Sequence, residues 1–399
     1  MKTCSLYSFA LALFLVSLAS CTKMDDYLKY TDNKEIKYAG KLDSARVLSG
    51  KDRVVIQGLL TSDPNINLIK IFYNLRHDSV LVDITRTAGI DTIAVSISLP
   101  EGSHNFEIVS YDRKGNSSVP VQITGRSYGE IYQETLFNRV VKNAEKSGND
   151  AVIDLYPAEE TSPFAVFKYT TTQGDAKTVT VKRDATQVVL KDFKSMTDVS
   201  MQTFFLPDTA AVDTFSAPLQ HLVVAEDVTS FYLKNPGTPI VRGDNETGKW
   251  GVAKDWLYNN NVLNQNNSTA GGWSTDAGGT IHFESKDWGG EGLVNGKMYQ
   301  KFDLAPGTYE LTYYSDGSGG EIHSNFLAVR GTELPDIDNL DNNSDVLARY
   351  QANSSNVGGT RSIKFNITET TPMAVGWVVS TGSSTWLHFN SIKLRLVGQ

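Results

Sequence analysis

The chain has 399 residues, with 37 Lys and Arg against 45 Asp and Glu, so its formal net charge is −8. This acidic balance, without any run of basic residues, argues against nucleic acid as a partner, because polyanions are bound by clusters of lysine and arginine. The only cysteines are Cys4 and Cys21, which excludes a disulfide framework and cysteine-rich metal sites.

The N-terminus has the parts of a secretory signal peptide. Its apolar run from Leu11 to Val16 is too short to span a bilayer. The tetrapeptide Leu18-Ala19-Ser20-Cys21 that follows resembles a lipobox, whose cysteine is acylated and becomes the new N-terminus. We therefore expect removal of residues 1–20, lipidation at Cys21 and a tether over 21–39. The alternative is an ordinary cleaved signal with an incidental cysteine.

The residues after Cys21 are Thr22-Lys23-Met24-Asp25-Asp26-Tyr27. They resemble the lysine-plus-acidic export signal of Bacteroidetes lipoproteins that are moved to the outer face of the outer membrane. No second apolar stretch approaches the length of a membrane span. We expect a protein of the outer membrane that is attached by lipid alone and faces the cell exterior.

Residues 40–128 show short strands separated by turn sequences such as Ser62-Asp63-Pro64-Asn65, a spacing typical of a β-sandwich. We predict an immunoglobulin-like domain here. The expected strands are Arg53 to Leu60, Leu68 to Asn74, Val80 to Thr85, Thr92 to Ser98, Asn105 to Tyr111 and Val119 to Thr124.

Residues 129–228 are predicted to form a linker helix and a second, fibronectin-III-like domain. The helix is expected from Glu130 to Lys146, where Leu136, Val140 and Val141 have helical spacing. Runs rich in Thr and Val then favour strands. The expected strands are Ala151 to Tyr156, Ala165 to Thr171, Thr178 to Arg183, Gln187 to Leu190, Ser200 to Phe205 and His221 to Val224.

Residues 229–399 contain alternating strands over Met298 to Leu304 and Thr308 to Tyr313, joined by the turn Ala305-Pro306-Gly307. Leu-Ala-Pro-Gly-Thr-Tyr-Glu-Leu resembles the hairpin of galactose-binding-like jelly rolls, the fold of many carbohydrate-binding modules. Closing strands are expected at Ala374 to Ser380 and Trp386 to Val397. The predicted fold class is therefore all-β, with two immunoglobulin- or fibronectin-III-like sandwiches followed by a jelly roll.

All six tryptophans lie in the last 150 residues. A pyranose ring packs its C–H groups on an aromatic face while its hydroxyls need polar partners, so aromatic rings in polar loops predict a glycan site. The alternative is that each loop tryptophan closes one end of the sandwich. Trp377 is expected in the core, and Trp386 fits either role. The predicted ligand-binding residues are Trp256, Tyr258, Trp273, Asp276, Asp287 and Trp288.

Catalytic motifs are weak. The string Asp316-Gly317-Ser318-Gly319-Gly320 lacks the spacing of a nucleophile elbow and is interpreted as a flexible turn. A glycosidase needs two carboxylates that face each other across the sugar. The residue types are present at Asp276, Glu284, Asp287 and Glu291, but the sequence does not give the distances between them. We expect no enzyme activity.

No cofactor is expected, and the metal content is left open. Structural calcium is conceivable because the run from Asp336 to Asp345 is rich in oxygen ligands. It lacks the glycine and terminal glutamate of an EF-hand loop, and an exposed acidic loop is the simpler interpretation.

Taken together, the lipobox, the export signal, the two sandwiches and the jelly roll resemble surface lipoproteins of Bacteroidetes polysaccharide-utilisation loci, of the surface glycan-binding type. The resemblance implies non-catalytic binding of a polysaccharide or oligosaccharide and its supply to an outer-membrane transporter complex. Two other functions stay open: an adhesin for host protein or matrix glycan, and a lipoprotein glycosidase.

Overall fold

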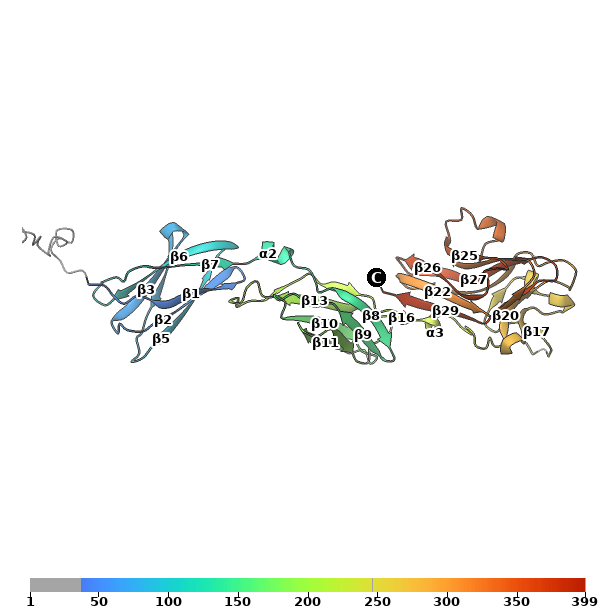
Figure 1. The fold of residues 1–399 in the computed structure, drawn as a ribbon, viewed down its shortest axis with the longest axis horizontal. Coiled ribbons are helices and arrows are strands. Elements are labelled where there is room, and N and C mark those ends of the chain that lie inside the picture. The colour runs from blue at the N-terminus through green and yellow to red at the C-terminus, as the bar shows by residue number, and fades with distance from the viewer. Residues whose placement is uncertain (1–36, 246, 399) are drawn as a thin grey trace, which may run out of the picture. The chain divides into compact units, whose positions relative to one another are not determined.

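The computed structural model describes residues 37–245 and 247–398 (Figure 1). The predicted signal peptide, Cys21 and the export segment lie outside these residues. Strands make up 53% of the structure and helices 7%, so the predicted all-β fold is confirmed. Within the described ranges, no helix combines the length and the apolar character needed to cross a membrane.

The chain forms two compact units. Their residues are those up to 136 with 205–216 in the first unit, and 137–204 with 217–399 in the second. Segment 205–216 is held in the first unit partly by Asp213, which accepts two hydrogen bonds from the guanidinium of Arg53 at 2.9 and 2.8 Å. The first unit thus contains the predicted immunoglobulin-like domain plus a segment that is distant in sequence.

The first sandwich consists of two antiparallel sheets, ordered β1-β2-β5 and β4-β3-β6-β7. Their alternating apolar residues, such as Val54 and Ile56 on β2 and Ile69 and Ile71 on β3, form one core. All six predicted strands are present, and β1 is additional. The elements of this unit are β1 (Asp43–Gly50), β2 (Arg53–Leu60), β3 (Ile66–Tyr73), η2 (Asn74–Arg76), β4 (Asp78–Asp83), β5 (Asp91–Ser98), β6 (Gly102–Asp112), β7 (Val121–Ser127), α2 (Glu130–Glu134) and β14 (Phe215–Ser216).

The predicted linker helix from Glu130 to Lys146 is wrong over most of its length. Only Glu130–Glu134 is helical, and Val141–Ser147 is strand β8, which pairs with β9. A short helix with three apolar residues gains little tertiary burial, whereas pairing with β9 gives the backbone amides and carbonyls of this segment hydrogen-bond partners.

The second sandwich has the sheets β12-β9-β8 and β11-β10-β13, with β15 also pairing with β13. Buried Ile153, Phe167, Phe193 and Met201 contribute to its core. The six predicted strands are all present. The elements are β8 (Val141–Ser147), β9 (Asp150–Leu155), β10 (Phe164–Thr170), β11 (Ala176–Lys182), β12 (Gln187–Leu190), β13 (Val199–Phe205) and β15 (Gln220–Leu222).

The C-terminal jelly roll has three sheets, ordered β16-β29-β22-β26, β17-β19-β20-β28-β23 and β18-β21-β27-β24-β25. Their strands are β16 (Glu226–Asp227), β17 (Trp250–Gly251), β18 (Leu257–Tyr258), β19 (Gly272–Ser274), β20 (Thr280–Glu284), β21 (Gly296–Leu304), β22 (Gly307–Ser315), β23 (Gly317–Gly319), β24 (Ile322–Arg330), β25 (Val346–Ala352), β26 (Gly359–Ile367), β27 (Thr371–Thr381), β28 (Trp386–Phe389) and β29 (Ser391–Val397). Its short helices are α3 (Thr229–Tyr232), η3 (Asn260–Val262), η4 (Gln265–Asn267), η5 (Asp276–Gly278) and η6 (Ile337–Asn339).

The strands that flank Ala305-Pro306 do not form the predicted hairpin. Strand β21 pairs with β27, whereas β22 pairs with β26 and β29, so the turn connects two different sheets. Gly307, with a φ of 154°, permits this sharp corner. The two strands themselves are where the alternation predicted them.

The core of the jelly roll is aromatic and is shared by all three sheets. The ring of Trp377 on β27 stacks on Phe389 of β28, with centroids 4.3 Å apart, and Tyr313 of β22 lies 5.0 Å from Phe389. Trp377 is 1% exposed, which confirms its predicted core position.

Candidate functional site

The candidate site lies on the face of sheet β17-β19-β20-β28-β23 that is turned away from the core. Because side chains alternate along a strand, Ile281 and Phe283 of β20 enter the core, as do their counterparts on β28. His282 of β20 therefore projects from the opposite face. Its cross-strand partner on β28 is His388, and Glu284 is paired in the same way with Trp386.

These side chains border a pocket of about 340 Å³. Trp288, in the loop that follows β20, is 63% exposed at its rim, whereas His282 and His388 are only 1% and 6% exposed. The pocket thus has an aromatic rim and a buried polar floor. Its lining residues are Lys249, Asp276, His282, Glu284, Trp288, Trp386 and His388.

Glycines on strand β23 make room for two of the lining side chains. Gly317 is paired with His388 and Gly319 with Trp386. A Cβ at Gly317 would lie 2.9 Å from the His388 ring, and one at Gly319 would lie 2.8 Å from the Trp386 indole nitrogen. The segment interpreted from sequence as a flexible turn is therefore a paired edge strand whose missing side chains accommodate two rings.

Both histidines bind a carboxylate through Nε2. His282 Nε2 is 3.0 Å from Glu284 Oε2, and His388 Nε2 is 2.5 Å from Asp316 Oδ1. Burial is the largest influence on His282 and lowers its pKa, although its carboxylate neighbours oppose this effect.

Asp276 comes from the turn that precedes β20 and supplies an ionised carboxylate. Burial favours its neutral form, but a hydrogen bond from Ser274 and the nearby His282 and Lys249 outweigh this effect and lower its pKa. Its Oδ2 lies 3.4 Å from His282 Nδ1 and 3.3 Å from Lys249 Nζ. Asp276 was predicted as a ligand-binding residue, and the structure places it in the pocket.

Two of the predicted tryptophans belong to the core instead. Trp256 and Trp273 are 4% and 7% exposed. Their ring N–H groups donate to the backbone carbonyls of Asn235 at 3.1 Å and Ile240 at 2.8 Å. For both, the structure corresponds to the alternative in which the indole closes the sandwich, because no face of either ring is free for a sugar.

Of the remaining predicted ligand-binding residues, one lines the pocket and two do not. Trp288 lines the pocket, and Trp386, which the sequence left undecided, lines it as well. Asp287 lies in the loop of Trp288 but does not line the pocket, and Tyr258 is a half-exposed residue of edge strand β18 in another sheet.

Sequence analysis missed the histidines and Lys249. The available signal was the strings Ile281-His282-Phe283-Glu284 and Trp386-Leu387-His388-Phe389, in which polar or aromatic residues alternate with core residues. Such alternation identifies one strand face, but not which other strand lies beside it.

The two pocket carboxylates are both engaged by the same imidazole. Asp276 lies beside Nδ1 of His282 and Glu284 beside Nε2. A glycosidase would instead place its acid and its base on either side of a bound sugar. Asp276 and Glu284 therefore flank the His282 ring, one at each nitrogen.

Two carboxylates of the acidic run from Asp336 to Asp345 form ion pairs with basic side chains. Asp336 pairs with Lys297 and Asp341 with Arg349, each at 2.6 Å. Leu340 is buried against the outer face of the sheet that contains β24 and β27. In the part of the chain that the structure describes, the one group of three or more metal-ligating side chains is Asp276, His282 and His388.

Among solved structures, the chain is similar to a segment of two fibronectin type III domains from chicken tenascin, with 10% identity and a TM-score of 0.20. That match covers 46% of this chain and 97% of the tenascin segment. It is also similar to chicken CNTN1 FN1–FN3, with 11% identity, a TM-score of 0.27, and coverage of 47% of this chain and 69% of that one. The carbohydrate-binding module TmCBM61, solved with β-1,4-galactotriose, has 16% identity, a TM-score of 0.24, and coverage of 41% and 96%.

A search of curated proteins gives no match. Two family models match separate parts of the sequence. Residues 234–376 match a domain of unknown function, DUF5013, and these residues include most of the pocket lining. Residues 21–215 match a second domain of unknown function, DUF4998.

Proposed function

We propose that the pocket of the C-terminal jelly roll binds a carbohydrate without cleaving it. The observation that carries this proposal is the exposed indole of Trp288 at the rim of a pocket that also contains Trp386 and a floor of buried polar groups. A sugar needs both features, since its C–H face packs on an aromatic ring and its hydroxyls require fixed donors and acceptors.

The pocket offers both hydrogen-bond acceptors and donors. The carboxylates of Asp276 and Glu284 accept hydrogen bonds from hydroxyls, and the ammonium of Lys249 donates them. The volume of about 340 Å³ lies at the small end of the range for ligand pockets. A short segment of a glycan therefore occupies the pocket while the rest of the chain stays in solvent.

The cellular role follows from the N-terminal sequence. Lipidation at Cys21 and the acidic export segment after it would hold the protein on the outer face of the outer membrane. Residues 40–228 then separate the anchor from the pocket along the chain. In this role the protein captures polysaccharide or oligosaccharide at the cell surface and supplies it to an outer-membrane transporter complex.

Affinity electrophoresis of the full-length protein in gels that contain soluble polysaccharides tests the proposal. We expect at least one polysaccharide to retard the parent protein, and the retardation to be much weaker in Trp288→Ala and Trp386→Ala. Tyr258→Ala, which removes an exposed aromatic ring from another sheet, is the matched control and should migrate like the parent.

Release of reducing sugar from the retarding polysaccharide would replace this proposal with a glycosidase. Retention on host matrix protein, with no retardation by any polysaccharide, would replace it with an adhesin.

A further inference from the structure

We propose that Asp276, His282 and His388 form a binding site for a divalent transition-metal ion of the zinc type, with one coordination position open to the pocket. This inference does not depend on glycan binding, since it rests on the three side chains and the carboxylates behind them.

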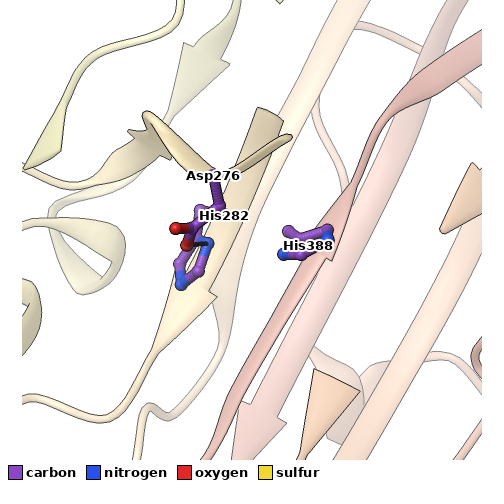
Figure 2. Close-up of side chains that lie close together, drawn as sticks. All are labelled: Asp276, His282 and His388. Atoms are coloured by element: carbon purple, nitrogen blue, oxygen red, sulfur yellow. Dashed lines mark ion pairs between the residues drawn. The ribbon is translucent and has the colours of Figure 1, made fainter. Parts of the chain in front are cut away.

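The three ligands are brought together by strand register. His282 and His388 are direct cross-strand partners on β20 and β28, and Asp276 enters from the turn before β20 (Figure 2). One ligand atom from each residue lies within 4.8 Å of the others. The separation of 3.4 Å between His282 Nδ1 and Asp276 Oδ2 equals the edge of a tetrahedron whose metal–ligand bonds are about 2.1 Å long.

The second observation is that both histidines have a buried ring nitrogen without a hydrogen-bond partner. Nδ1 of His282 and Nδ1 of His388 are inaccessible to solvent and accept or donate no hydrogen bond. Buried polar atoms of this kind are rare, and an ion that the coordinates do not contain is one recognised explanation. A metal ion bound between these nitrogens would satisfy both.

Each histidine is also oriented as a metal ligand would be. The other nitrogen of His282 contacts Glu284, and that of His388 contacts Asp316. Metal-ligating histidines almost always have a carboxylate, carbonyl or water at the second nitrogen, which fixes the ring and leaves the first nitrogen for the metal. Both histidines of the cluster thus have a carboxylate at Nε2 and leave Nδ1 for a metal ion.

Charge and ligand type indicate which ion fits. The carboxylates of Asp276, Glu284 and Asp316 outnumber the one ammonium in the cluster, that of Lys249, and a divalent cation offsets this surplus of acidic side chains. Two nitrogen ligands and one oxygen suit zinc and similar transition metals, whereas calcium and magnesium select oxygen ligands. Three protein ligands leave a fourth position for water or for a bound ligand.

The test uses the full-length protein after treatment with a chelator and desalting. Titration calorimetry should show one equivalent of Zn²⁺ bound and no binding of Ca²⁺ at the same concentrations. With Co²⁺ in place of Zn²⁺, the visible absorption of a tetrahedral nitrogen and oxygen site should appear. Zn²⁺ should also raise the melting temperature of the parent protein.

His388→Gln and Asp276→Asn should each weaken Zn²⁺ binding by roughly a hundredfold or more, and Glu284→Gln, which removes the carboxylate at Nε2 of His282, by about ten- to a hundredfold. His323→Gln is the matched control, because this histidine is exposed and lies outside the cluster. If His388→Gln fails to fold, Asp276→Asn gives the same comparison, since its side chain is one-third exposed.

The proposal is overturned if the parent protein takes up less than one equivalent of Zn²⁺. It is also overturned if Asp276→Asn and His388→Gln bind as tightly as the parent, or if His323→Gln loses binding to the same extent. Because these titrations contain no sugar, a protein that binds zinc but no polysaccharide would refute only the proposed function, and the converse result would refute only the metal site.

Discussion

The substitution Trp288→Ala separates recognition from stability, because this indole is 63% exposed. A buried tryptophan removes about 200 Å² from water, so about 130 Å² of Trp288 is available for contact. A sugar ring on one face covers about half of this area. At ~25 cal/mol per Å² the contact is worth about 1.6 kcal/mol, which is roughly a tenfold change in Kd. Loss of an exposed side chain should change the free energy of unfolding by less than about 0.5 kcal/mol.

Two measurements on the same protein check this expectation. Titration calorimetry with the polysaccharide that retards the parent protein gives Kd, and urea denaturation gives the free energy of unfolding. Trp288→Phe keeps a flat apolar face and should lose less affinity than Trp288→Ala. If Trp288→Ala folds normally and binds as tightly as the parent, the aromatic rim does not contact the ligand and the reasoning fails.

Three further predictions concern other parts of the chain. Trp256→Ala should lower the free energy of unfolding by about 3–5 kcal/mol in urea denaturation, and an unchanged value would contradict its place in the core. Asp63 accepts hydrogen bonds from two backbone amides, which hold its pKa below the ordinary value. Its stabilising effect is therefore present above the ordinary pKa of about 3.9 and is lost as the pH falls through the lower folded-state pKa. Asp63→Asn should be less stable than the parent at pH 7, and denaturation curves that stay equally far apart at acidic pH would contradict this. Cys21→Ala should abolish acyl labelling and release the protein from membranes, whereas Cys4→Ala should change neither; a labelled, membrane-bound Cys21→Ala protein would disprove the lipobox.

The sandwich fold could be predicted because alternation is a local property of the sequence. Strand β2 was predicted with its observed ends, Arg53–Leu60, since a short run rich in Val, Ile and Leu precedes the turn sequence Ser62-Asp63-Pro64-Asn65. The prediction of the linker helix was wrong because strand pairing is not a local property of the sequence. The few apolar residues between Leu136 and Val141 fit a helix locally, but pairing with β9 decides the structure, and pairing is not visible in a short window.

Two of the seven residues that line the candidate site were predicted as ligand-binding residues. Trp288 and Asp276 were identified because aromatic and acidic residues in polar loops are a compositional signal. His282 and His388 are more than a hundred positions apart, and they meet only because β20 and β28 are adjacent in the required register. Trp256 and Trp273 have equally polar neighbours in sequence, and their burial depends on how the loops close over the sheets.

The alternation along β20 and β28 divides their positions into two groups with separate tasks. The odd-numbered positions from 281 to 283 and from 387 to 389 belong to the core, whereas His282, Glu284, Trp386 and His388 line the pocket. Substitutions at the even positions can therefore alter which ligand is held without removing an apolar contact from the interior. Under the proposed function, a handful of exchanges at these even positions would change ligand preference while the residues between them keep the domain stable.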